Sequence, residues 1–179
     1  MKRFMLDTNM ASYVIKGDPP EARLRLAALP MESIIISVVT QAELLYGLAR
    51  KGHPVAFSAL IREFLNRVKI LPWDEGAATV YGNLRASCAA AGVTLSALDM
   101  LIAAHAIAAK ATLVTHDKAF SLVPDGALAV EDWITSPLLS GKDTQIPNAL
   151  TAKTLRKSKK GEDISKVVDS DDLFEQLDI

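Results

Sequence analysis

The sequence predicts an α/β fold with helices on both faces of a parallel sheet. Short apolar runs recur at residues 4–6, 34–36, 68–71, 113–114 and 127–130. Such uninterrupted, partly β-branched runs are typical of parallel strands buried on both faces. Segments with helical spacing of apolar residues separate them, at 40–52, 56–68, 74–92 and 96–110. This alternation favours a doubly wound sheet with right-handed crossovers.

Composition restricts the class of protein. A length of 179 residues predicts one domain with some chain left over, and the single Cys rules out an internal disulfide and fits a reducing, cytoplasmic location. No basic and apolar leader or long apolar run is present, so we expect neither export nor membrane spanning. The net charge of −1 neither supports nor excludes a nucleic-acid partner.

The character of the chain changes after Trp133. Residues 136–147 are rich in Ser, Thr, Pro and Gly and are predicted to be a linker, which leaves a domain at 1–135 and a tail at 148–179. The tail begins with a basic cluster at 156–160 and continues with a strongly acidic stretch. It is too short and polar to bury a core alone, so we expect it to fold only against another surface.

Four acidic residues fall where a ligand is expected. Open α/β sheets bind ligands beyond the carboxyl ends of their strands. The acids that the predicted topology can bring to that edge are Asp7, Glu43, Asp99 and Asp117. Two carboxylates about 4 Å apart repel each other by roughly 4 kcal/mol at an effective dielectric constant near 20, so such a cluster takes up protons or recruits a cation. Oxygen ligands suit Mg²⁺ or Mn²⁺, and no Cys/His spacing indicates zinc. The inferred chemistry is metal-dependent phosphodiester hydrolysis.

A structural explanation of the same acids stays open at this stage. Ser96 with Asp99, and Thr40 with Glu43, have the spacing of a capping box at a helix N-terminus. Asp7 can cap the next helix, and Asp117 can open a turn. Each acid taken singly fits this explanation, whereas the convergence of all four on one edge favours a metal site.

The ordered motifs resemble those of a known family. "FMLDTN", "ISVVTQAELLYG", "SALDMLIAAHA" and "VTHDKAF" are similar to the four motifs of PIN domains, and most closely to VapC-type ribonuclease toxins of toxin–antitoxin pairs. The resemblance covers residues 1–135. It implies a three-layer α/β/α sandwich, a homodimer, and RNA cleavage that depends on Mg²⁺ or Mn²⁺, with tRNA as a candidate substrate.

The same resemblance assigns roles to particular residues. It implies that Asp7, Glu43 and Asp99 hold the metal ion and that Asp117 belongs to the catalytic set, although many relatives have Asn at the position of Asp117. Two supporting residues follow from the motifs: Asn9 would orient the first carboxylate, and Thr115 would assist around the last.

The tail resembles a different family. "LTAKTL" and "DSDDLFEQL" are similar to the toxin-binding part of RelB/DinJ-type antitoxins, whose usual toxins have another fold. The tail is therefore expected either to mask the acidic site, with Arg156 replacing the metal ion, or to bind another chain. Arg156 is chosen because a guanidinium can bind two carboxylates at once. The partners implied are RNA and either a cognate antitoxin or the chain's own tail.

Two competing functions follow from the same residues. An aspartyl phosphotransferase of the haloacid dehalogenase type needs a second acid two positions after Asp7, where this chain has Asn9. A catalytically silent protein-binding module, locked by its tail, is the alternative from another class.

His105 is expected to pack within the helices, His116 to be exposed, and the Ala-rich run at 103–111 to lie at a dimer interface.

Overall fold

Five parallel strands form a single sheet in the order β3-β2-β1-β4-β5 in the computed structural model, which describes residues 2–135. The strands are β1 (Phe4–Leu6), β2 (Ile34–Ser37), β3 (Lys69–Leu71), β4 (Thr112–Val114) and β5 (Val130–Glu131). Met5 is in register with Ile35 on one side and Leu113 on the other. The predicted parallel α/β fold is confirmed. The predicted linker at 136–147, the tail at 148–179 and Arg156 lie outside the described residues.

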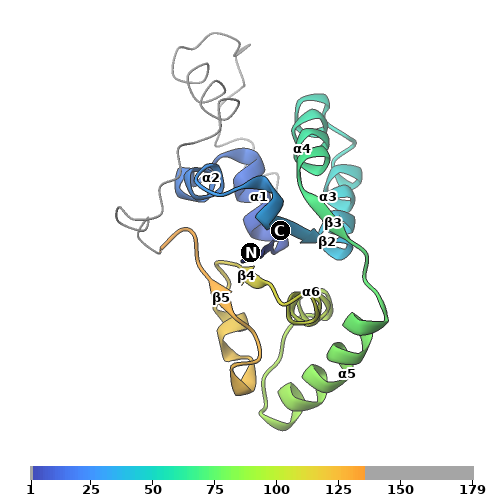
Figure 1. The fold of residues 1–179 in the computed structure, drawn as a ribbon. Coiled ribbons are helices and arrows are strands. Elements are labelled where there is room, and N and C mark those ends of the chain that lie inside the picture. The colour runs from blue at the N-terminus through green and yellow to red at the C-terminus, as the bar shows by residue number, and fades with distance from the viewer. Residues whose placement is uncertain (1, 136–179) are drawn as a thin grey trace.

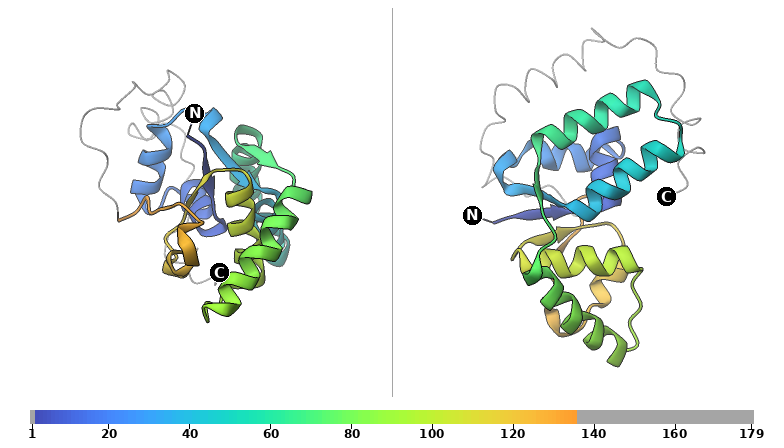
Figure 2. Two further views of the ribbon diagram at one scale, coloured as in Figure 1. Left: turned by 60° about the horizontal axis from the view of Figure 1, so that its bottom comes forward. Right: turned by 90° about the vertical axis from the view of Figure 1, so that its right-hand side faces the viewer.

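Helices form a layer on each face of the sheet (Figure 1). One layer contains α1 (Thr8–Lys16), α2 (Pro20–Ala27), α3 (Val38–Arg50) and α4 (Val55–Arg67), and the other contains α5 (Glu75–Ala90) and α6 (Ala97–Ala108). In the second layer α6 covers the sheet and α5 packs on α6 (Figure 2). Three short 3₁₀ turns, η1 (Met31–Ser33), η2 (Lys118–Leu122) and η3 (Pro124–Gly126), complete the connections. None of the helices within residues 2–135 has the length and apolar content needed to cross a membrane.

The central strands divide their side chains between two cores. Phe4 and Leu6 point into the core beneath α1 to α4, whereas Met5 points into the core beneath α6. This is the alternation that a strand imposes on successive side chains. The prediction of strands buried on both faces holds for β1, β2 and β4 but is wrong for β3 and β5, which are partly exposed because they form the edges.

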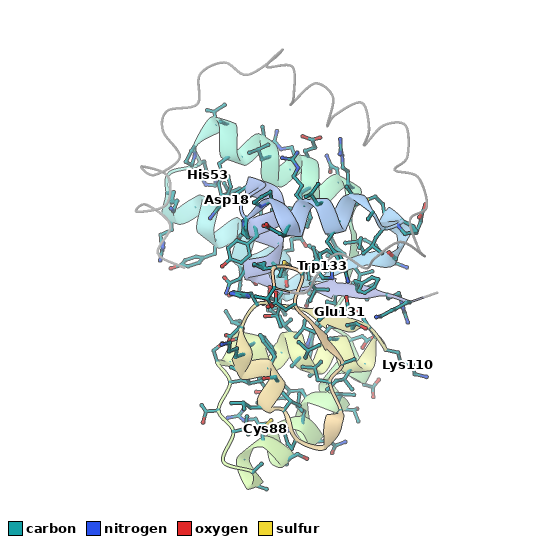
Figure 3. The ribbon with its side chains drawn as sticks, turned by 90° about the vertical axis from the view of Figure 1, so that its left-hand side faces the viewer. Asp18, His53, Cys88, Lys110, Glu131 and Trp133 are labelled. Atoms are coloured by element: carbon teal, nitrogen blue, oxygen red, sulfur yellow. The ribbon has the colours of Figure 1, made fainter. Side chains whose placement is uncertain are left out.

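The end of the described chain packs back onto the sheet. Trp133 is 1% exposed and its ring meets that of Phe4 edge-on, with centroids 5.7 Å apart. Its indole Nε1 donates to a carboxylate oxygen of Glu131 at 3.1 Å, and the two residues lie between the helical layers (Figure 3). Trp133 therefore anchors the last strand, β5, against the first strand, β1.

The Ala-rich run on α6 packs inside the chain. Ala103, Ala104 and Ala106 are fully buried in the core shared with the sheet and α5. For these three residues the expectation of a dimer interface at 103–111 is wrong, because their small side chains are used for close packing within the chain itself.

Candidate active site

The candidate site lies at the carboxyl ends of β1 and β4. These two central strands are neighbours, although β4 follows β1 only after the chain has formed β2 and β3 on the other side. Sheets of this kind bind ligands at this point, where the strand order reverses. Asp7 directly follows β1, and its backbone N–H donates to the Val114 carbonyl at the end of β4 at 3.1 Å. Residues 115–117 follow β4 directly, and therefore lie next to Asp7.

Asp7 is the most buried acid of the predicted set. Asp7 is only 3% exposed. Its Oδ1 accepts a hydrogen bond from the Met10 N–H at 2.6 Å, and Asp7 thereby caps α1. Burial raises the pKa of Asp7 to about 6, the hydrogen bond with Thr115 and the cap oppose the rise, and the charges of Asp99 and Asp117 add to it. The carboxylate is thus held in an environment that disfavours its own charge.

Thr115 joins the two acids that follow β1 and β4. Its hydroxyl is hydrogen-bonded to Asp7, and the same oxygen accepts the Asp117 N–H at 2.9 Å. Asp117 is exposed, and its Oδ1 accepts the Ala119 N–H at 2.8 Å at the start of η2. A buried threonine, 1% exposed, therefore sets the position of Asp117 relative to Asp7.

Glu43 and Asp99 approach from the two helical layers. Glu43 is half-buried on α3 and accepts a short hydrogen bond from the Thr8 hydroxyl. Burial raises its pKa, the Thr8 bond lowers it, and the charge of Asp99 raises it further. Asp99 lies in the first turn of α6, where it accepts from the Ser96 hydroxyl at 2.6 Å. The same charge on Asp99 therefore acts on Glu43 and on Asp7.

The capping explanation is partly correct. Asp7 caps α1, and Ser96 caps α6 through the Asp99 N–H at 3.2 Å. The capping box expected for Thr40 and Glu43 is wrong, because α3 begins earlier, at Val38. Its cap is Ser37, whose Oγ accepts the Val39 N–H at 3.0 Å. Asp7 therefore caps a helix while the charges of Asp99 and Asp117 act on it.

The oxygen atoms around Asp7 are of the chemical kind that a hard divalent cation prefers. They are carboxylate and hydroxyl oxygens, and the charges acting on Asp7 are those of other acids. Among residues 2–135 no three His, Cys, Asp or Glu side chains form a compact ligand set. The acids instead hold local hydrogen bonds to Met10, Ser96, Ala119 and Thr8. A bound cation would offset the raised pKa of Asp7 by stabilising its charged form. Fold and site together define the class: an α/β protein with acidic residues beyond the carboxyl ends of its central strands.

The remaining predicted residues have distinct surroundings. Asn9 is exposed in the first turn of α1, next to Thr8, which is the residue that contacts Glu43. The sequence motifs did not identify Thr8 as a residue that contacts Glu43, although its position between Asp7 and Asn9 indicated that it lies at the site. His116 is exposed as expected, and its Nδ1 lies 2.9 Å from an oxygen of Asp132. A pocket between α1, α3 and α4 is lined in part by Thr8 and Glu43.

Comparison with known proteins places the chain in a family. The PIN domain model matches residues 4–126. The chain is 37% identical over 134 residues to the tRNA(fMet)-specific endonuclease VapC of Shigella flexneri, which covers 74% of this chain and 99% of that protein. It is 35% identical over 132 residues to ribonuclease VapC2 of Rickettsia felis, covering 73% of this chain and 97% of the relative.

Solved structures agree with the sequence comparison. DNA-bound VapBC from Salmonella typhimurium matches with a TM-score of 0.68 and 34% identity, over 74% of this chain and 99% of that chain. VapBC2 from Rickettsia felis, bound to a promoter DNA fragment, matches with a TM-score of 0.66 and 33% identity, over 73% and 98%. The chain belongs to the PIN domain family and, within it, to the VapC ribonucleases of toxin–antitoxin systems. PIN nucleases of this kind depend on a divalent metal ion.

Proposed function

We propose that this chain is an endoribonuclease toxin that hydrolyses RNA phosphodiesters at the acidic cluster beyond β1 and β4. The observation that carries the proposal is Asp7, a carboxylate 3% exposed at the reversal point of the sheet, on which two further acids act. A buried carboxylate with this environment is a recurrent feature of functional sites. Membership of the VapC family supplies the reaction class.

The proposed metal ligands are Asp7, Glu43 and Asp99, with Asp117 completing the catalytic set. The cofactor proposed is Mg²⁺ or Mn²⁺, because both prefer carboxylate oxygens. When bound, such an ion lowers the pKa of water and neutralises charge on a phosphate. The chain's own residues prepare this site: Thr8 orients Glu43, and Thr115 orients Asp7 while fixing the backbone of Asp117.

The proposed substrate is a tRNA. Support comes from the relatives in Shigella flexneri and Salmonella typhimurium, both named as tRNA(fMet)-specific endonucleases. Attack by water rather than by the ribose 2′-hydroxyl would leave 5′-phosphate and 3′-hydroxyl ends. The test is to incubate the full chain with total tRNA and Mg²⁺ or Mn²⁺, map the cut, and analyse the ends, with EDTA and an Asp99→Asn variant as controls. Cyclic phosphate ends, or cleavage that survives EDTA, would reject the mechanism.

The proposed protein partner is a cognate antitoxin, since the matched solved structures are VapBC complexes. A homodimer and a cytoplasmic location are proposed on the family resemblance and the single Cys.

The tail is proposed to mask the site, with Arg156 near the acids. Removal of residues 136–179 leaves a chain as long as the matched relatives, so the truncated protein is a suitable test. Masking predicts faster cleavage and tighter Mn²⁺ binding after truncation; equal values in the two proteins would exclude it. A wild-type chain and a truncated chain that both bind antitoxin but never cleave RNA would favour the silent module instead.

A further inference from the structure

A buried hydrogen bond joins the two helices that carry Glu43 and Asp99. His105 lies in the third turn of α6 and Ser37 at the N-terminus of α3, and the two residues are 3% and 0% exposed. His105 Nδ1 is 2.9 Å from Ser37 Oγ, a contact that links positions 68 residues apart. A polar contact this deep between two helices of a site restricts their relative movement.

The direction of the bond follows from the surroundings of Ser37. Its Oγ already accepts the Val39 N–H at 3.0 Å as the cap of α3, and its own proton is then available to be donated. Burial lowers the pKa of His105, and the charge of Asp74 at the start of α5 opposes that shift. The imidazole is therefore neutral at neutral pH, and Nδ1 can accept the Ser37 proton.

The position of this bond matters because of where the two acids lie. Glu43 is six residues after Ser37, and Asp99 is six residues before His105. Six helical residues span about 9 Å. Asp99 acts on Glu43 electrostatically, so these two acids are also near each other. The start of α3 thus pairs with the end of α6, and the two helices run in opposite directions along this segment. One contact is a directed hydrogen bond and the other is a repulsion between like charges.

We infer that the His105–Ser37 hydrogen bond is a positioning link, which fixes the spacing of α3 and α6 on which the binding of one divalent ion by Glu43 and Asp99 depends. The repulsion between the acids pushes the helices apart when no cation is bound, and the buried bond at the other end of the segment resists that displacement. His105 thus acts through the helices and touches neither metal nor RNA. This inference rests on the proposed function.

The experiment measures Mn²⁺ affinity of the full chain by isothermal titration, together with the free energy of unfolding. His105→Phe keeps an aromatic ring but removes the acceptor, and we expect Mn²⁺ to bind about ten-fold more weakly, as when other supporting partners of metal ligands are removed. His105→Asn keeps an acceptor oxygen close to the place of Nδ1 and should recover most of that loss. Ser37→Ala should weaken binding to a similar extent as His105→Phe.

The matched control is Ser33→Ala. Ser33 directly precedes β2, the strand that Ser37 ends. It is 2% exposed and donates one hydrogen bond to the Pro30 carbonyl at 2.6 Å. Its loss should lower stability while leaving Mn²⁺ affinity unchanged. In the double variant of Ser37 and His105 the loss of affinity should not exceed that of Ser37→Ala alone, because Ser37→Ala already removes the link together with the cap of α3. RNA cleavage should lose kcat with KM unchanged.

The outcomes separate this inference from the proposed function. A wild-type chain that binds no Mn²⁺, or an Asp7→Asn variant that binds it as well as wild type, overturns the proposed function and this inference with it. If wild type binds and Asp7→Asn does not, yet Ser37→Ala keeps full affinity, the positioning role is overturned alone. Should His105→Phe fail to fold, the Ser37→Ala and Ser33→Ala pair decides the question by itself.

Discussion

Asp7 and Asp132 are acids that follow parallel strands of one sheet, yet their environments have opposite effects. Asp7 follows the central strand β1, and burial raises its pKa to about 6. Asp132 follows the edge strand β5; partial burial alone would raise its pKa, but hydrogen bonds from Thr135, the Ile134 N–H and His116 lower it to about 2. A position at the end of a strand does not by itself decide how an acid behaves.

The difference lies in what surrounds each carboxylate. Asp132 is at an open edge, where the following turn supplies two donors, the Ile134 N–H at 2.8 Å and the Thr135 N–H at 3.3 Å. His116, which follows β4, supplies another through Nδ1 at 2.9 Å. Asp7 is enclosed by central strands and helices, and the charges that reach it are negative. The charged form of Asp132 is therefore stabilised by its hydrogen-bond donors, whereas the charged form of Asp7 would be stabilised by a bound cation.

The largest expected effect is on catalysis. Asp7→Asn removes a proposed metal ligand and should lower kcat for RNA cleavage by about a thousand-fold, since an ion at such a site stabilises several kcal/mol of transition-state charge. Asp132→Asn is the matched change at the other strand end and should leave kcat within a few-fold. If both variants lost the same factor in kcat with saturating Mn²⁺, burial at the end of a strand would not identify the catalytic carboxylate.

The second effect is on stability without metal. The same Asp7→Asn change should increase the free energy of unfolding at pH 7.5 by up to about 3 kcal/mol, because it removes the cost of a buried charge while keeping an oxygen for the Met10 N–H. Urea unfolding in EDTA measures this. Added Mn²⁺ at about 100 times its dissociation constant should stabilise wild type by about 2.7 kcal/mol and the variant hardly at all. A variant less stable than wild type in EDTA would make the capping role of Asp7 dominant.

The third effect is the sign of the pH dependence. Asp7 binds protons more tightly in the folded state, since its pKa of about 6 lies above the ordinary 3.8, so its contribution to stability falls as pH rises from about 4 through 6. Asp132 has a lowered pKa of about 2, so its contribution is present above about 4 and is lost as pH falls toward 2. Unfolding measured in EDTA from pH 3 to 8 should show the first slope flattened in Asp7→Asn and kept in Asp132→Asn.

The smallest effect concerns Thr115. Its hydrogen bond lowers the pKa of Asp7, so Thr115→Val should raise that pKa further, because a hydrogen bond to a charged group contributes about 1.5 kcal/mol. The acidic limb of the cleavage profile should therefore move to higher pH. Thr135→Val, which removes a donor from Asp132, should leave the profile in place. A profile unmoved by Thr115→Val would separate this hydroxyl from the acid.

Much of the fold and of the candidate site could be predicted from the sequence. The strands at 4–6 and 34–36 and the helix at 96–110 were predicted within a few residues, because their apolar patterns agree with their final burial. Helix α2 was not predicted, since only Ala22 of its residues is buried and its pattern is therefore weak. The start of α3 was placed too late, because Val38 and Val39 favour a strand locally whereas Ser37 provides a cap.

The sequence by itself determined the alternating architecture, the order of the motifs and the positions of Asp7, Asp99 and Asp117 after strands or at helix starts. These follow from local propensity and periodicity. Only the tertiary structure decided that Thr8 contacts Glu43, that Thr115 joins Asp7 to Asp117, and that His105 reaches Ser37. It also decided that Asp7 is held with a raised pKa and Asp132 with a lowered one. The reason is physical: burial and the direction of a donor belong to the packed arrangement of distant segments, and no pattern within one segment contains them.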